Sequence, residues 1–169
     1  YRRTIVLDQP GTTLDLVREK VKWAAVEIMN SQGILDEKDE QALEQILGEA
    51  QRFLFVVDAQ VGITPFDQWL AKELLKSKKP VLLVINKTEY QDSVSQEFAS
   101  LGFDSVVEVS AAHKKGIELL KDWCRLEAEE EMRESEPISL ALIGRPNSGK
   151  STLMNKLCRK KVSRVSPVA

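Results

Sequence analysis

The most informative stretch of the sequence is Gly144-Arg-Pro-Asn-Ser-Gly149-Lys150-Ser151, which fits the pattern G-x-x-x-x-G-K-[ST] of a phosphate-binding loop, or P-loop. The apolar run 138–143 before it predicts a strand, and residues 151–159 after it predict a short helix. Glycines at both ends let the backbone wrap around phosphate oxygens, and the helix N-terminus adds partial positive charge there. We therefore expect Lys150 to neutralise the β- and γ-phosphates of a nucleotide and the Ser151 hydroxyl to ligate Mg²⁺.

On either side of this loop, apolar runs alternate with amphipathic stretches. This rhythm is typical of repeated βα units, and it predicts an α/β fold with three layers around a mostly parallel sheet. Strands are expected at residues 21–29, 52–58, 81–86, 105–110 and 138–143. Helices are expected at residues 37–51, 65–77, 93–101, 117–126 and 151–159. The second of these helices is predicted to begin with a capping box, in which Thr64 is the N-cap, Pro65 the first residue and Asp67 the third.

Composition restricts the class of protein. With 43% hydrophobic and 30% charged residues in a chain of 169, disordered and fibrous proteins are excluded. The longest apolar runs, 53–57 and 81–85, are far shorter than the roughly 20 residues that a membrane-spanning helix needs. The net charge of −2 provides no general basic field for collecting nucleic acid.

The cysteines indicate a reducing compartment. Cys124 and Cys158 stand 34 positions apart, and His113 is the one histidine, which argues against a disulfide scaffold or a Cys/His metal site. We therefore expect two reduced cysteines in a cytoplasmic protein without a signal peptide. Since the chain starts at Tyr1 rather than Met, we also expect the sequence to begin inside a longer protein.

Two further segments predict which base is bound. Asn86-Lys87-Thr88-Glu89 follows an expected strand at its carboxyl end, where ligands of open α/β sheets bind. A carboxylate there accepts hydrogen bonds from the N1–H and exocyclic amine of guanine, a pair that adenine does not present. Ser110-Ala111-Ala112 ends the next strand, where a backbone N–H is expected to reach the guanine O6. The two segments together predict guanine specificity.

These segments carry a family resemblance. Residues 86–89 resemble the N-K-x-D motif and Ser110-Ala111 the S-A motif of the P-loop GTPases of the translation-factor type. Residues 8–15, Asp-Gln-Pro-Gly-Thr-Thr-Leu-Asp, resemble the P-G-T-T-R-D switch I motif, although a β-turn entering a strand would account for them too. Residues 144–155 look like the GRPN-x-GKS-x-L-x-N signature of the Era, MnmE and Der (EngA) GTPases.

The order of the motifs is unusual, because the P-loop comes last instead of first. A natural circular permutation would explain this order, and so would a piece cut from a protein with two GTPase domains in series. Residues 164–169 can be laid on residues 5–10, and a permuted single domain would not need this segment twice. The overlap favours the tandem arrangement of the Der (EngA) family, with MnmE-like or Era-like GTPases and a true permutant as the alternatives.

The Der resemblance implies a division of the chain. Residues 1–126 would be a first GTPase domain that lacks its opening strand, P-loop and helix, and residues 138–169 would open a second domain. Residues 127–137 are acidic and are interpreted either as a linker or as a solvated helix end. Residues 138–159 could instead fill the vacant first βα unit, within one molecule or in a domain-swapped dimer.

The resemblance also implies an activity, which is binding of GTP and GDP with Mg²⁺, and GTP hydrolysis with water as the nucleophile. In such proteins the GTP-bound form binds the large ribosomal subunit, with its rRNA and ribosomal proteins, during assembly. Lys150 and Thr13 would act in catalysis, and Ser151 and Thr13 would ligate Mg²⁺. Asn147 matches a K⁺ ligand of potassium-activated relatives, or is a structural turn residue. The nucleotide-binding residues carried over are Gly144, Arg145, Pro146, Asn147, Ser148, Gly149, Lys150, Ser151, Thr152, Asn86, Lys87, Glu89, Ser110, Ala111 and Gly33.

Three positions depart from the family pattern. Asn30 stands where switch II, D-x-x-G, has its aspartate, and a neutral side chain holds a Mg²⁺-bound water poorly, although Gly33 is kept. Glu89 replaces the guanine-reading aspartate, and Leu14 replaces arginine. We interpret these changes as weak nucleotide binding or slow hydrolysis by the first domain, with retained activity as one alternative. The other alternative is a non-catalytic interaction module.

Overall fold

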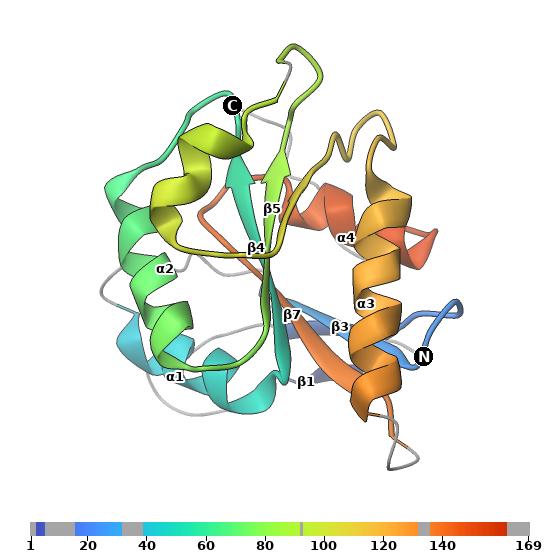
Figure 1. The fold of residues 1–169 in the computed structure, drawn as a ribbon. Coiled ribbons are helices and arrows are strands. Elements are labelled where there is room, and N and C mark those ends of the chain that lie inside the picture. Colours follow the sequence, from blue (N-terminus) through green and yellow to red (C-terminus); the bar gives the residue numbers. More distant parts are fainter. Residues whose placement is uncertain (1–2, 6–15, 32–38, 92, 132–135, 162–169) are drawn as a thin grey trace.

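The computed structural model describes residues 3–5, 16–31, 39–91, 93–131 and 136–161. Among these residues, seven strands form one sheet in the order β1-β2-β3-β7-β4-β5-β6 (Figure 1). β1, β2 and β3 pair antiparallel, whereas β3, β7, β4, β5 and β6 are all parallel. The strands are β1 Arg3–Ile5, β2 Leu16–Lys20, β3 Val26–Ser31, β4 Arg52–Asp58, β5 Val81–Asn86, β6 Val106–Glu108 and β7 Ile138–Ile143.

Helices cover both faces of this sheet, so the predicted three-layer α/β fold is confirmed. One face carries α1, α2 and the 3-10 helix η1, and the other carries α3 and α4 (Figure 1). None of the described helices has the length and apolar character needed to cross a bilayer. Their bounds are α1 Glu40–Glu49, α2 Pro65–Lys76, η1 Ser95–Leu101, α3 Ile117–Glu131 and α4 Lys150–Cys158.

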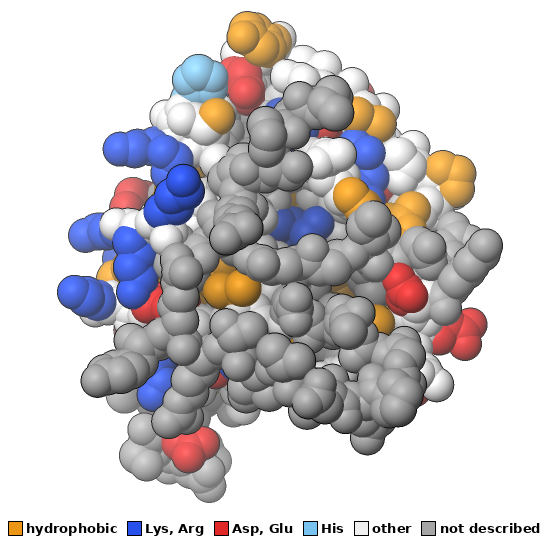
Figure 2. Space-filling model, turned by 180° about the vertical axis from the view of Figure 1, so that it is seen from behind, with side chains coloured by type: hydrophobic (Ala, Val, Ile, Leu, Met, Phe, Trp, Pro, Cys, Tyr) orange, Lys and Arg blue, Asp and Glu red, His pale blue; other side chains and the backbone are white. Residues whose placement is uncertain are grey.

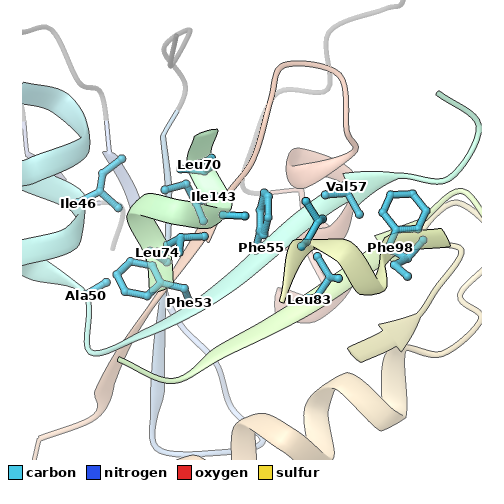
Figure 3. Packing of buried hydrophobic residues seen from close by; sticks show 14 of the residues in the cluster. Ile46, Ala50, Phe53, Phe55, Val57, Leu70, Leu74, Leu83, Phe98 and Ile143 are labelled. Carbon is cyan, nitrogen blue, oxygen red and sulfur yellow. The ribbon is translucent and has the colours of Figure 1, made fainter. Parts of the chain in front are cut away.

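Strand β4 divides the core into two halves, because successive side chains of a strand point to opposite faces. Phe53, Phe55 and Val57 pack against α1, α2 and η1, as Figure 3 shows. Leu54 and Val56 belong to the second cluster, under α3 and α4. All seven residues of the strand are buried, which explains its continuous apolar sequence.

Strand β7 lies between β3 and β4 of the same chain. Leu140 is opposite Ile28 on β3, and Ala141 is opposite Phe53 on β4. The start of the strand is also fixed, since the backbone N–H of Ser139 donates to Gln51 Oε1 at 2.9 Å. The segment that carries the P-loop therefore completes the sheet formed by the earlier residues, within one molecule.

Several predicted elements have different bounds. The predicted strand 21–29 was wrong in its first half, because the chain bends after β2 and Val21 N–H donates to Val26 O across the turn. Residues 93–101 form a 3-10 helix only from Ser95, and strand 105–110 shortens to Val106–Glu108. The helix predicted at 37–51 begins at Glu40 and ends at Glu49, with residues 37–38 outside the described part.

Helix α3 extends further than predicted, into the acidic stretch that was interpreted as a linker or a helix end. It continues to Glu131, so its last residues are helical and the linker interpretation does not describe them. The extension has a partner on the sheet, since Glu127 Oε2 accepts a hydrogen bond from Arg52 Nε at 2.7 Å. Residues 132–135 lie outside the described residues.

Candidate nucleotide-binding site

The P-loop, residues 144–151, connects the end of β7 to the start of α4 and touches two neighbouring strands. A Cβ atom on Gly144 would lie 2.3 Å from the backbone oxygen of Val56 on β4. A Cβ atom on Gly149 would lie 2.2 Å from Asn86 Nδ2 at the end of β5, and Gly149 has φ +98°. Both glycines are therefore required by close approach of neighbouring groups, in addition to any need of a phosphate.

Side chains hold four carbonyl groups of the loop. Lys150 Nζ donates to Gly144 O at 2.9 Å and to Arg145 O at 2.7 Å. Lys87 Nζ donates to Asn147 O at 2.8 Å, and Asn86 Nδ2 donates to Ser148 O at 3.0 Å. Engaging the carbonyl oxygens fixes the peptide planes of the loop, an arrangement that suits N–H groups directed at an anion, although the N–H of Ser148 donates to Arg145 O at 3.4 Å.

Lys150 occupies the position expected for the phosphate-neutralising lysine, at the first residue of α4. Burial, together with the neighbouring Arg145 charge, lowers the pKa of its amine to about 8. An anionic phosphate beside the amine would favour its charged form again. The arrangement thus suits a ligand that brings negative charge into the loop.

Asn86 joins the P-loop to the segment predicted to read the base. Its Nδ2 donates to Ser148 O, and its Oδ1 accepts the N–H of Ala111 at 3.0 Å. The structure therefore brings residues 86–89, 110–112 and the P-loop together. The N–H of Ala111 is used within the protein, and so is the N–H of Ser110, which donates to Lys115 O.

Glu89 provides an acceptor in this region. Its side chain is 18% exposed, and its Oε2 atom is buried without a hydrogen-bond partner among the residues that the structure describes. Its other oxygen lies 3.9 Å from His113 Nε2. A buried carboxylate oxygen without a donor is costly, and a ligand N–H would satisfy it. This acceptor thus fits a base that presents N–H groups.

The predicted metal ligands are described only in part. Ser151 lies in the first turn of α4, with its Oγ 3.5 Å from Asn30 Nδ2 at the end of β3. Thr13, Gly33 and Leu14 lie outside the described residues. Within the described ranges, no group of three or more His, Cys, Asp or Glu side chains could hold a metal ion. Of the two predicted Mg²⁺ ligands, Ser151 is therefore the one that the structure describes.

The remaining predicted residues line the loop. Pro146 and Asn147 are exposed, and Thr152 is half-buried in α4. Asn147 has φ +63°, a conformation that asparagine adopts more readily than most residues, so it serves the turn.

Sequence reasoning missed Asp58, the last residue of β4. Its Oδ2 atom accepts a hydrogen bond from Lys87 Nζ at 2.8 Å and lies 3.5 Å from Arg145 Nη2. The available signal was its place at the carboxyl end of a buried strand, next to the strand that ends at Asn86.

Comparison with known proteins identifies the family of this chain. The family described as "50S ribosome-binding GTPase" matches residues 1–87 and 139–169, which include the P-loop, Asn86 and Lys87. The chain belongs to this GTPase family. Glu89 and residues 110–112 fall outside the matched ranges, so their contribution to a GTPase site is judged from the geometry alone.

Individual relatives of the GTPase family are GTPases Der. The chain is 40% identical to GTPase Der of Aquifex aeolicus over 181 residues, which cover 99% of this chain and 42% of the relative. It is 39% identical to GTPase Der of Natranaerobius thermophilus over 94% of this chain and 39% of the relative. These values confirm the resemblance to Der. The chain spans about two fifths of the length of these relatives.

Proposed function

We propose that this chain binds GTP and GDP in one pocket formed by the P-loop and residues 86–89 and 110–112. Asn86 carries this proposal, because its amide bonds both the P-loop, at Ser148, and the base-reading turn, at Ala111. Two segments that bond to the two polar atoms of one side-chain amide lie close together and face the same ligand in this proposal. The P-loop binds the phosphates, and the base lies near Glu89 and the turn.

The proposed base specificity rests on Glu89. Its carboxylate accepts the N1–H and the exocyclic amine of guanine, one on each oxygen, which gives Glu89 Oε2 the hydrogen bond that it lacks among the described residues. The N–H of Ala112 is the group of this turn that reaches the guanine O6, since the N–H groups of Ser110 and Ala111 are engaged within the protein.

For hydrolysis, we propose that water attacks the γ-phosphate and that positioning and charge supply the catalysis. Lys150 neutralises the β- and γ-phosphates, and Ser151 and Thr13 hold Mg²⁺, which supplies further positive charge when bound. Asn147 holds K⁺ beside the phosphates in this proposal. Because Asn30 is neutral, we expect Mg²⁺ to be held weakly and hydrolysis to be slow.

We further propose that the protein acts in the cytoplasm on the large ribosomal subunit during its assembly. The name of the matched family supports this partner. A basic edge on the α3–α4 side supports an RNA contact, and Figure 2 shows Lys and Arg side chains gathered along that side. Exposed cations next to these two helices are Lys114 and Lys115, before the start of α3, and Arg159, Lys160 and Lys161, after the end of α4.

The two ends of this basic edge are close in space. The pKa of the Glu118 carboxyl, in the first turn of α3, is lowered by its hydrogen bond from Lys121 and by the charges of Arg125 and Arg159. The end of α4 therefore lies near the start of α3.

Replacing Lys114 and Lys115 by Glu should weaken binding of the chain to isolated large ribosomal subunits and make that binding less dependent on salt.

A titration with fluorescent GTP and ATP analogues tests the pocket, in Mg²⁺ with K⁺ and again with Na⁺. The proposal expects GTP-selective binding by the chain as a monomer, loss of selectivity in Glu89→Gln, and retained selectivity in Glu89→Asp. Absence of binding in every condition would refute the single pocket. Light scattering during the titration separates the monomer from a domain-swapped dimer, in which the same pocket would form between two chains.

The division of the chain into residues 1–126, 127–137 and 138–169 remains a proposal, in which a linker between domains would follow the end of α3 at Glu131. The alternative function, a non-catalytic module, predicts guanine nucleotide binding without phosphate release. Measuring phosphate release over hours, with Lys150→Met as the inactive control, distinguishes the two functions.

A further inference from the structure

Asp58 lies at the meeting point of three strand ends and the P-loop. It is 3% exposed, and its Oδ1 atom accepts the backbone N–H groups of Gln60 at 2.8 Å and Val61 at 3.3 Å. These bonds fix the carboxylate in the turn after β4. Its other oxygen is left to face the side chains of Lys87 and Arg145.

Lys87 links this carboxylate to the P-loop. Its ammonium donates to Asp58 Oδ2 and to Asn147 O, each at 2.8 Å. Lys87 also has φ +65°, a left-handed conformation that lysine rarely adopts. The strained backbone directs the side chain toward the loop, and a specific partner is needed to hold it there.

The charges around the loop explain why a carboxylate is needed. Lys87, Arg145 and Lys150 are three cations close to the same turn, and within the described residues Lys87 and Arg145 each form an ion pair with Asp58. Like charges repel one another, and the charge of Arg145 already lowers the pKa of Lys150. A buried anion below the loop lets the cations approach without an anionic ligand being present.

We propose that Asp58 is a positioning residue for the P-loop, which acts by holding Lys87 on the Asn147 carbonyl and Arg145 beside it. The inference rests on the proposed nucleotide site. In this role Asp58 touches no nucleotide and serves to preorganise the loop, so that less ordering is required when phosphates bind. Its loss should therefore speed nucleotide release more than it slows association.

The test replaces Asp58 by Asn, because an amide oxygen can still accept the N–H groups of Gln60 and Val61. We expect GDP release from Asp58→Asn to be about tenfold faster, the size expected for losing one charge-assisted hydrogen bond. The matched control is Asp122→Asn, which removes the same charge from an exposed pair with Arg125 and should leave release unchanged. Circular dichroism and thermal unfolding verify that both variants fold.

A double-mutant cycle with Lys87→Met separates positioning from a general structural role. If Asp58 acts through Lys87, Asp58→Asn should change release little in the Lys87→Met background, whereas independent effects would multiply and overturn the proposal. Should Asp58→Asn not fold, Lys87→Met alone must speed nucleotide release about tenfold, and unchanged release would refute the proposal.

A wild-type chain that binds no guanine nucleotide overturns the proposed function and this inference together. Wild-type binding with unchanged release from Asp58→Asn overturns this inference alone.

Discussion

Asn30 and Ser151 lie 121 positions apart in the sequence, yet Asn30 Nδ2 is 3.5 Å from Ser151 Oγ. The contact joins the end of β3 to the first turn of α4, across the pair that β3 forms with β7. Asn30 is buried, so its amide is a fixed part of the floor beneath the proposed phosphate site. The residue that departs from the switch II pattern is therefore adjacent to the proposed Mg²⁺ ligand.

Replacing Asn30 by Asp should make nucleotide binding more dependent on Mg²⁺. A carboxylate holds the water shell of Mg²⁺ better than an amide, so we expect the Mg²⁺ concentration needed for half-maximal GDP retention to fall about tenfold. In EDTA the same variant should bind GDP more weakly than wild type, because a buried anion then faces the phosphates unscreened. Dissociation of a fluorescent GDP analogue measures both effects. An unchanged Mg²⁺ dependence would mean that position 30 does not act on the metal.

Replacing Gly149 by Ala should disrupt the nucleotide site, and replacing Gly48 by Ala should not. A Cβ atom at Gly149 would lie 2.2 Å from Asn86 Nδ2 in a left-handed backbone conformation, so the bridge from Asn86 to Ser148 and Ala111 would break. We expect at least a tenfold loss of GTP affinity, the cost of about one such hydrogen bond or more.

Gly48, inside α1, is the matched control because a Cβ atom there meets nothing within 4 Å. Alanine at this position should raise the free energy of unfolding by about 0.5–1 kcal/mol, since it restricts the unfolded chain. Urea unfolding and nucleotide titration on both variants provide the comparison. Equal affinities in the two variants would contradict the bridging role of Asn86.

Removing the carboxylate of Glu127 should destabilise the fold. Its pair with Arg52 is mostly protected from water, with side chains 17% and 11% exposed at a separation of 2.7 Å. Breaking such a pair costs more than an exposed one, so we expect Glu127→Ala to lower the free energy of unfolding by about 2 kcal/mol. Glu129→Ala, at an exposed site of the same helix, should change it by less than about 0.5 kcal/mol. Similar losses of unfolding free energy in both variants would show that the charge of the helix, and not the pair with Arg52, causes the effect.

Both thiols should resist alkylation in the folded protein. Burial raises the pKa of Cys124 to about 12, and burial together with the Glu19 charge raises that of Cys158 to about 11. At pH 8 a thiol with the latter pKa is thiolate in about one molecule per thousand, and the thiolate is the reactive form.

The same shifts predict a loss of stability in alkali. A group whose folded pKa is raised stabilises the fold fully below its unfolded pKa, near 8.5 for a cysteine, and less as pH rises toward 11.

Iodoacetamide labelling at pH 8, with and without guanidinium, tests the predicted resistance to alkylation, because it measures the reactivity of each cysteine by mass spectrometry. Rapid labelling of folded Cys158 would show that it is not protected.

Much of the candidate site could be predicted from local sequence. The pattern 144–151, its place between a strand and a helix, and the polar residues after two successive strands all depend on spacing within short segments. The capping box was predicted for the same reason, and Thr64 Oγ1 accepts the N–H of Asp67 at 3.2 Å. Asp58 was missed because its importance comes from Lys87 and Arg145, which are distant in sequence and reach it only in the folded sheet.

Hydrophobic periodicity and turn chemistry were sufficient for the α/β class and for strands β4, β5 and β7, because burial on both faces leaves a continuous apolar run. They could not decide where β7 pairs, since permutation, tandem domains and domain swapping all use the same local pattern. That choice depends on hydrogen bonds between strands far apart in the chain, such as Leu140 opposite Ile28 and Ala141 opposite Phe53. The length of α3 likewise depended on Arg52, a partner on the sheet that no local pattern of the acidic stretch reveals.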